Sequence, residues 1–244
     1  MAQTVTSPAA TPESKSLPAR FVGILFAPRA TYADVVARPR WLGMFLTVFV
    51  LSATIATSLM ATDVGRRAVV DQQITQSESY GRHLTDVQID SIEKISEYYV
   101  YFAPVIQFVA LALGSLIAAG IAFAVFNALL GGDATFKQTY AVVVHSGVVL
   151  SVLALFTTPL AYARESLAGV TNLGVFLPFL DETSFAARAL GAIDLVYIWW
   201  MVSIAIGLGV LYRKRTAPIA TTLLVAYVAI GLIIAAIKTA TTGV

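Results

Sequence analysis

The sequence predicts an all-α protein that spans a membrane five times, and three observations lead to this prediction. Of the 244 residues, 58% are hydrophobic. Only 12% are charged, which is about half the share in an average soluble domain. The apolar residues are concentrated in five stretches, and each reaches the roughly 20 residues needed to cross the hydrocarbon core of a bilayer. These stretches are residues 43–62, 104–130, 139–162, 190–212 and 218–238.

The two ends of the chain differ from these stretches. Residues 1–17 are rich in Ala, Thr, Ser and Pro, so we expect a disordered tail there. They lack the apolar core of a secretory signal peptide, and we expect the first apolar stretch to remain as a membrane anchor. Residues 239–244 are expected to form a short tail. The membrane domain is therefore predicted to extend over residues 42–238.

Residues 18–41 combine aromatic and basic side chains and predict an amphipathic segment at the membrane interface. Pro28 suits the first turn of a short helix, and Pro39 suits its end. Such a segment favours the headgroup layer and anionic lipids. It could fix the entry of the first membrane helix, dock a partner protein or sense lipid. The residues expected at the membrane surface or against a partner are Arg20, Phe26, Pro28, Arg29, Tyr32, Arg38, Pro39, Arg40 and Trp41.

Residues 63–101 predict a helical hairpin outside the membrane. The first arm should end near Tyr80, with Gly81 directly after it. Thr85-Asp86-Val87-Gln88 has the spacing of a capping box, which predicts the start of the second arm. A stripe of apolar side chains at helical spacing is expected to pack on the first arm, or else to dock another protein. The stripe consists of Ile89, Ile92, Ile95, Tyr99 and Phe102.

Charges in the connections predict the orientation. Short loops rich in Lys and Arg favour the cytoplasmic side of a membrane. Basic residues precede the first apolar stretch, and Arg213, Lys214 and Arg215 separate the fourth stretch from the fifth. Residues 63–101 are acidic overall. We therefore expect the N-terminus in the cytoplasm and the C-terminus outside.

One acidic residue is expected within the membrane region. Asp194 is expected about one turn inside the outer end of the fourth stretch. Arg164, Arg188 and Lys238 are expected at a similar depth, so an ion pair could lock the last three membrane helices together. Ionisable groups inside a membrane are rare and often functional. A proton or cation site at Asp194 is therefore the alternative.

Asn127 and His145 form a second polar pair. Both are expected near the cytoplasmic ends of neighbouring helices. A side-chain hydrogen bond between them would contribute about 0.6 kcal/mol in a membrane. The alternative is a pH-sensitive switch.

Small residues four positions apart recur in three of the stretches and predict close helix packing. We expect this packing within one chain, or else between two copies or with another membrane protein. The pairs are Gly114 with Ala118, Gly120 with Ala124, Ser203 with Gly207, Ala205 with Gly209 and Gly231 with Ala235.

Residues that carry chemistry are scarce. The chain has no cysteine and two histidines, His83 and His145, which lie far apart in sequence. It has no phosphate-binding Gly-x-x-x-x-Gly-Lys loop and no His-Glu-x-x-His or Gly-x-Ser-x-Gly pattern. We therefore expect no enzymatic activity, no cofactor, no metal site and no nucleic-acid partner.

Three further stretches lie at or near the ends of the apolar segments. The first is Phe26-Ala27-Pro28-Arg29-Ala30-Thr31-Tyr32, followed by Arg38-Pro39-Arg40-Trp41. The second is the inner turn, residues 130–138, which contains Gly131, Gly132, Phe136 and Lys137. The third is residues 193–199, Ile-Asp-Leu-Val-Tyr-Ile-Trp, followed by Gly207-Leu208. In their order and placement, these stretches resemble the Yip family of membrane proteins over about residues 18–238, most closely its bacterial branch.

The resemblance implies a non-enzymatic adaptor, because the eukaryotic members are adaptors of Golgi and endoplasmic-reticulum membranes that interact with Rab-type GTPases. For the bacterial branch it implies a multi-pass protein of the cytoplasmic (inner) membrane. We therefore expect an adaptor or scaffold that contacts the bilayer, its anionic headgroups and an unidentified membrane protein or further copies of itself. The alternatives are a small-solute or ion transporter or channel component that uses Asp194, and, least favoured, a membrane enzyme.

Overall fold

The computed structural model describes residues 14–167, 169–181 and 183–241. Residues 1–13 of the expected tail and residues 242–244 lie outside this part of the chain. The described residues form helices joined by short connections, and their one β-bridge pairs Asn172 with Asp194. The helices are α1 (Leu17–Phe26), α2 (Pro28–Ala37), α3 (Leu42–Met60), α4 (Asp63–Glu78), α5 (Asp86–Ser96), α6 (Tyr99–Phe123), η1 (Ala124–Leu129), α7 (Phe136–Ala163), η2 (Leu173–Phe176), α8 (Phe185–Gly191), α9 (Leu195–Leu211) and α10 (Thr216–Thr241).

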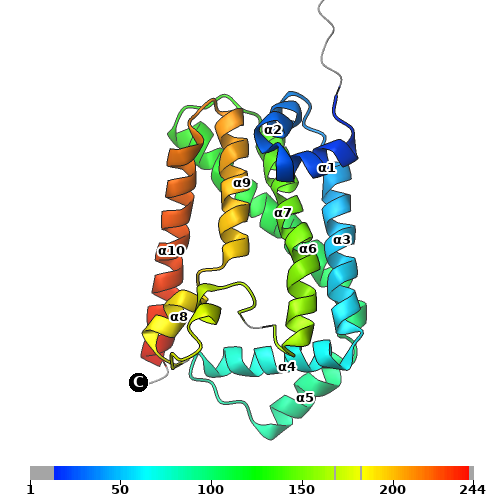
Figure 1. The fold of residues 1–244 in the computed structure, drawn as a ribbon, viewed down its shortest axis with the longest axis vertical. Coiled ribbons are helices and arrows are strands. Elements are labelled where there is room, and N and C mark those ends of the chain that lie inside the picture. Colours follow the sequence, from blue (N-terminus) through cyan, green and yellow to red (C-terminus); the bar gives the residue numbers. More distant parts are fainter. Residues whose placement is uncertain (1–13, 168, 182, 242–244) are drawn as a thin grey trace, which may run out of the picture.

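Four helical segments are long and apolar enough to cross a membrane: α3, α6 with η1, α7 and α10. They lie side by side in one bundle (Figure 1). Their bounds match four of the five predicted stretches to within about five residues at each end. The protein is therefore an all-α integral membrane protein, as predicted.

The remaining predicted stretch, the fourth along the chain (residues 190–212), differs from the prediction. A regular helix begins only at Leu195 and ends at Leu211, and its 17 residues fall short of the usual length of a span. It nevertheless runs beside α7 and α10 in the bundle (Figure 1). Before it, α8 ends at Gly191, and the chain turns through Ala192, Ile193 and Asp194. The count of five membrane crossings thus stays a prediction.

The centre of the bundle is α7, which contacts α3, α6 and α9. Residues 139–149 of α7 are all buried. Five of these eleven residues are valines, and Ala141, Ser146 and Gly147 are small, so neighbouring helices can approach closely. By contrast, α6 exposes most of its apolar surface, as expected of a helix that faces lipid. The interior of the protein is therefore built around α7.

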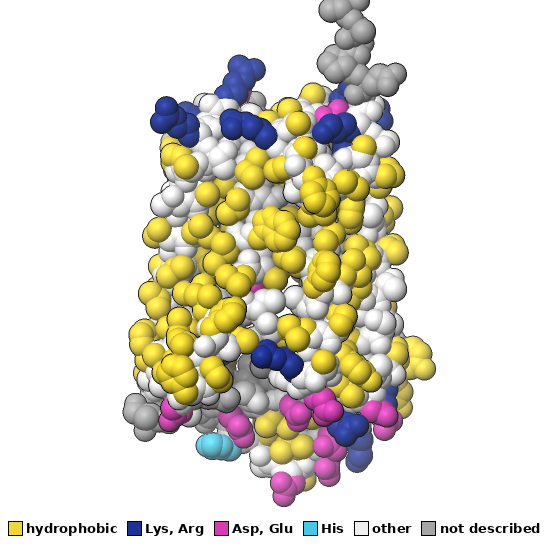
Figure 2. Space-filling model, viewed as in Figure 1, with side chains coloured by type: hydrophobic (Ala, Val, Ile, Leu, Met, Phe, Trp, Pro, Cys, Tyr) yellow, Lys and Arg dark blue, Asp and Glu magenta, His cyan; other side chains and the backbone are white. Residues whose placement is uncertain are grey.

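Charge separates the two ends of the bundle, with a broad apolar belt between them (Figure 2). Most basic side chains in this view gather at the upper end, and most acidic ones at the lower end. We call the end that carries α2, the inner turn and Arg213–Arg215 the basic end. The end that carries α4, α5 and the last turn of α10 is the acidic end.

The segment 18–41 folds as two helices. Ser16 caps α1, since its hydroxyl accepts a hydrogen bond from the Ala19 amide at 3.4 Å. The helix ends at Phe26, and α2 begins at Pro28 and ends at Ala37, before Pro39. The helix predicted between the two prolines is confirmed, whereas α1 was not predicted. Together, α1 and α2 form the N-terminal helix pair.

The predicted hairpin is present as α4 and α5. Gly81 follows the first arm with a φ of 72°, a left-handed conformation that glycine adopts without strain. Thr85 and Gln88 form the predicted capping box. The apolar stripe is not continuous, because the helix is interrupted between Ser96 and Tyr99, and both Ile95 and Phe102 are exposed. The second arm therefore ends earlier than predicted, and α6 begins within the range assigned to the hairpin.

Candidate functional site

A buried ion pair fastens the N-terminal helix pair. Only 5% of the Arg20 side chain is exposed, and its Nε donates to Asp34 Oδ2 at 2.8 Å. A second nitrogen, Nη2, donates to the Arg38 carbonyl at 3.2 Å. The ion pair thus links α1 to the middle of α2, and the second bond links α1 to the end of α2. Because the charges of Arg20 neutralise Asp34 inside the fold, Arg20 is not available to lipid headgroups, and its predicted place at the membrane surface is wrong.

Tyr32 joins the helix pair to the membrane bundle. Its side chain is completely buried, and its hydroxyl lies 2.8 Å from the Ser203 hydroxyl of α9. The ring packs on Gly207, where an added Cβ would lie 2.9 Å from Tyr32 Cε1. Burial raises the pKa of the Tyr32 hydroxyl, so it remains a neutral hydrogen-bonding group at physiological pH. Tyr32 was also predicted to face the surface, and this too is wrong.

The inner turn lies against the end of α2. Gln138 completes a capping box with Thr135 and also donates from Nε2 to the Val36 carbonyl at 3.2 Å. Gly131 adopts a φ of 66°, and Gly132 lies where an added Cβ would be 2.7 Å from the Tyr212 ring. The turn is therefore compact. Gln138 ends the second stretch that carries the family resemblance, and Val36 lies between the two parts of the first.

The remaining predicted surface residues differ in exposure. Phe26, Arg29 and Arg40 are exposed, as are Phe136 and Lys137 of the inner turn. Trp41 is half-buried, with its ring packed edge-on against Tyr140 at 5.0 Å between centroids. Half-buried positions are also found at Pro28, Arg38 and Pro39.

Asn127 and His145 do not bond to each other. Asn127 donates to the Ala134 carbonyl at 2.6 Å and accepts from the Tyr212 hydroxyl at 2.7 Å, which closes the inner turn onto α9. His145 is fully buried in α7, and its Nδ1 donates to the Ala141 carbonyl at 2.7 Å. Its Nε2 has no hydrogen-bond partner among the described residues. Equal depth in neighbouring helices did not bring these two side chains into contact.

Asp194 is a helix cap. Its Oδ1 accepts from the Val196 amide at 2.8 Å, and its Oδ2 accepts from the Thr171 hydroxyl at 2.7 Å. Its own amide donates to the Tyr227 hydroxyl at 2.9 Å. Among the described residues, no ion pair joins Asp194 to Arg164, Arg188 or Lys238. Hydrogen bonds, rather than the expected salt bridge, connect α9 and α10 at this point with Thr171. Thr171 lies in the loop between α7 and η2, which we call the outer loop.

A cavity of about 560 Å³ adjoins Asp194 at the beginning of α9, which does not extend to the acidic end. Apolar side chains of α3, α7 and the outer loop form part of its wall. Its polar lining consists of Gln72, Thr157, Thr158, Thr171, Asn172, Asp194, Tyr197 and Tyr227.

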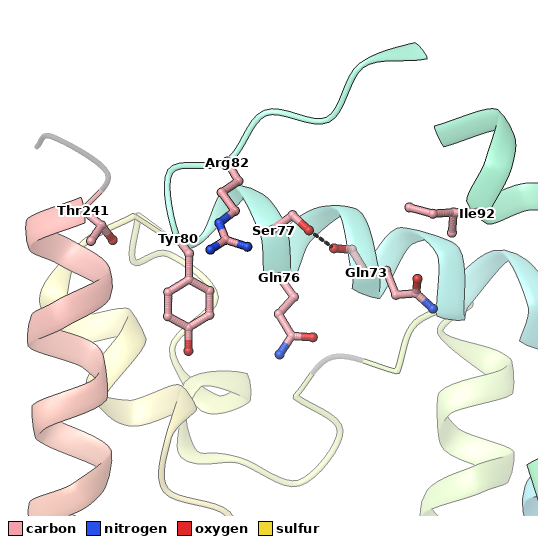
Figure 3. Close-up of a pocket in the computed structure, with 7 residues that line it drawn as sticks. All are labelled: Gln73, Gln76, Ser77, Tyr80, Arg82, Ile92 and Thr241. Atoms are coloured by element: carbon pink, nitrogen blue, oxygen red, sulfur yellow. Dashed lines mark hydrogen bonds between the residues drawn. The ribbon is translucent and has the colours of Figure 1, made fainter. Parts of the chain in front are cut away.

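A second cavity of about 670 Å³ lies where the hairpin meets the end of α10 (Figure 3). Tyr80 and Arg82 follow the end of α4 and lie beside Thr241. The side of the cavity that α4 forms is lined by Gln73, Gln76 and Ser77. The Lys238 ammonium lies 4.9 Å from the centre of the Tyr80 ring, a cation–π contact. This contact fastens the first arm of the hairpin to the last membrane helix.

Several contacts that hold the site together were not predicted from the sequence. Asp34, Ser203 and Gln138 each make a long-range contact that fixes the N-terminal helix pair. A signal existed for Gln138, because Thr135-Phe136-Lys137-Gln138 has capping-box spacing. Asp34, an acidic residue among basic ones on a short segment, was a second signal.

The Yip1 domain family model matches residues 22–237, which include α2, the inner turn and Ser203. No curated protein and no solved structure matches the chain. Since the family match covers most of its length, the chain belongs to the Yip1 domain family.

Proposed function

We propose that this protein is a non-enzymatic membrane adaptor that holds a membrane-associated protein at its basic end. The observation that carries the proposal is the hydrogen bond from Gln138 to the Val36 carbonyl. It fixes the inner turn beside the last turn of α2, so that two separate segments form one surface. Because Tyr32 and Arg20 anchor α2 from below, this surface is preformed, and a partner need not order it on binding.

The proposed partner presents an acidic surface. Arg40 and Lys137 are exposed on the two segments, and neither forms an ion pair with a carboxylate in the part of the chain that the structure describes. Cations without an ion pair attract and orient a partner of opposite charge before contact, and on this surface they outnumber the exposed Asp133 of the inner turn. Exposed apolar side chains such as Phe136 supply the contact area that charge alone does not provide.

The proposed location is the cytoplasmic membrane of a bacterium, with the basic end in the cytoplasm. The separation of charge between the two ends supports this orientation, since cytoplasmic loops carry an excess of Lys and Arg (Figure 2). The hairpin would then lie outside. The bacterial assignment rests on the resemblance of the large hairpin to that branch of the family.

Charge reversal with co-purification tests the proposal. Arg40→Glu with Lys137→Glu reverses the proposed surface, and Arg82→Glu with Lys94→Glu makes the same change in net charge on exposed residues of the acidic end. The tagged full chain is extracted in mild detergent from cells in which it is expressed at its natural level. We expect one stoichiometric partner to be lost in the first variant and retained in the second. If both variants retain the partner, or both lose it equally, the proposal is contradicted.

A second candidate function, passage of a small solute, is favoured by the polar cavity beside Asp194. Both carboxylate oxygens of Asp194 already accept hydrogen bonds from within the protein, so the cavity does not present a free carboxylate. Flux into liposomes that contain the purified protein and that stops in Asp194→Asn would place transport ahead of the adaptor function.

A further inference from the structure

A concave cluster of four basic side chains lies at the basic end, at the opposite end of α2 from Arg40. Arg29 at the start of α2 faces the turn between α9 and α10, which carries Arg213, Lys214 and Arg215. Together with Ala33, Gly209 and Val210 they line an open, shallow hollow of about 440 Å³. We call this the basic pocket. It is separate from the surface assigned to a protein partner, because ten residues of helix span about 15 Å.

The turn between α9 and α10 is locally fixed. The Lys214 amide donates to the Gly209 carbonyl at 2.9 Å, and the Arg213 amide donates to the Val210 carbonyl at 3.4 Å. These two bonds form a Schellman motif, whose left-handed position glycine usually occupies. Here that position is Arg213, with a φ of 52°. The hairpin ends its first arm with the same pair of bonds, yet with glycine, Gly81, at the left-handed position. Arginine thus occupies a position at which the backbone favours glycine.

The basic pocket contains no internal counter-charge. Its lining has four cations and no carboxylate, and none of the four pairs with a carboxylate among the described residues. In addition, α2 begins at Pro28 without a side-chain cap, so the positive end of its helix dipole lies at the same corner. Like charges held together without neutralisation repel one another, and a bound anion relieves this repulsion.

The place of the pocket identifies the anion. It lies where α9 ends and α10 begins, which is the boundary between the apolar belt and the basic end (Figure 2). Lipid phosphates lie at this boundary, and clusters of Lys and Arg next to membrane helices bind anionic headgroups. Arginine guanidinium groups also form paired hydrogen bonds with phosphate oxygens. We propose that the basic pocket binds the phosphate headgroup of an anionic glycerophospholipid in the leaflet that faces the basic end.

Arg213→Gly offers a clean test. Glycine suits the left-handed backbone, so the variant removes one cation without disturbing the turn. Arg215→Gln removes a second cation of the pocket, and Arg40→Gln removes one from the same end outside the pocket. The full chain is placed in phosphatidylcholine nanodiscs with a minor fraction of phosphatidylglycerol. Native mass spectrometry then measures the phosphatidylglycerol that each protein retains, and thermal unfolding in pure phosphatidylcholine confirms that each variant is folded.

We expect phosphatidylglycerol to be retained in preference to phosphatidylcholine. Its apparent affinity should fall about fivefold in Arg213→Gly and again in Arg215→Gln, and clearly less in Arg40→Gln, which removes a cation outside the pocket. An equal fall in Arg40→Gln would show a diffuse surface charge rather than a pocket. Unchanged retention in Arg213→Gly and Arg215→Gln also overturns the proposal. So does binding of inorganic phosphate without preference for phosphatidylglycerol, because the ligand would then be a soluble phosphate.

Discussion

The hydroxyl groups of Tyr32 and Ser203 lie 2.8 Å apart in the interior of the protein, although 171 positions separate the two residues in sequence. This contact makes the N-terminal helix pair a part of the membrane bundle rather than an appendage on its surface. The position of α2, and with it the proposed binding surface, is therefore set by α9.

A double-mutant cycle measures this link. Tyr32→Phe should lower the free energy of unfolding by about 1 kcal/mol, because it leaves the buried Ser203 hydroxyl without its partner. Ser203→Ala should have a similar effect. Once either hydroxyl is gone, removing the other should change little, so the coupling energy should be about 1 kcal/mol. Equilibrium unfolding in detergent gives these values, and strictly additive losses would contradict the contact.

Arg20→Ala should be far more harmful than loss of a surface cation. It removes the closest cation of the largely buried Asp34 carboxylate and leaves it the Arg38 guanidinium at 3.8 Å and the Lys15 amide at 3.4 Å, so we expect a loss of up to about 3–5 kcal/mol. The matched change is Arg66→Ala, which breaks an exposed ion pair with Asp63 on α4. That change should cost less than about 1 kcal/mol. Equal unfolding midpoints for the two variants would contradict the buried role of Arg20.

These residues show which features of the fold could be predicted from the sequence. Hydropathy identified four membrane helices, the prolines located α2, and turn chemistry located Gly81 and the capping box at Thr85, because each of these signals is local. The pairing of Arg20 with Asp34 depends on two helices folding back on each other. Composition indicated a basic surface segment. Arg20 was assigned to it because the sequence does not distinguish a buried arginine from an exposed one.

The small-residue pattern gives a third prediction. At Gly207 an added Cβ would lie 2.4 Å from Val142 and 2.9 Å from the Tyr32 ring, so Gly207→Ala should destabilise by about 1–3 kcal/mol. At Gly114 no atom lies within 4 Å of an added Cβ. Gly114→Ala should therefore be neutral or stabilise by up to about 1 kcal/mol. Thermal unfolding of both variants checks this, and the reverse order would contradict the packing.

Asp194 gives a fourth prediction. As a helix cap, it should tolerate asparagine, which also caps helices, whereas Asp194→Ala should cost about 1 kcal/mol. If the charge itself were needed, as in a cation site, asparagine would be as harmful as alanine. Unfolding measurements on both variants distinguish the two cases.

The sequence could not separate these roles for Asp194. Its position suggested a residue inside a continuous fourth span, where a charge would need an ionic partner. The helix in fact begins one residue later, and the outer loop supplies Thr171 as partner. Likewise, the prediction that Asn127 bonds to His145 used depth alone. Rotation of the helices about their axes decides such contacts, and long apolar helices contain little information about that rotation.

The most direct test of the adaptor proposal is site-specific photo-cross-linking in intact membranes. A photoreactive residue replaces exposed Ala37 at the end of α2, or exposed Val87 on the hairpin as the control. We predict one discrete protein adduct from position 37, which disappears when Arg40→Glu and Lys137→Glu are combined in the same chain. An adduct at position 37 that survives this charge reversal, or adducts at position 87 alone, would contradict the account.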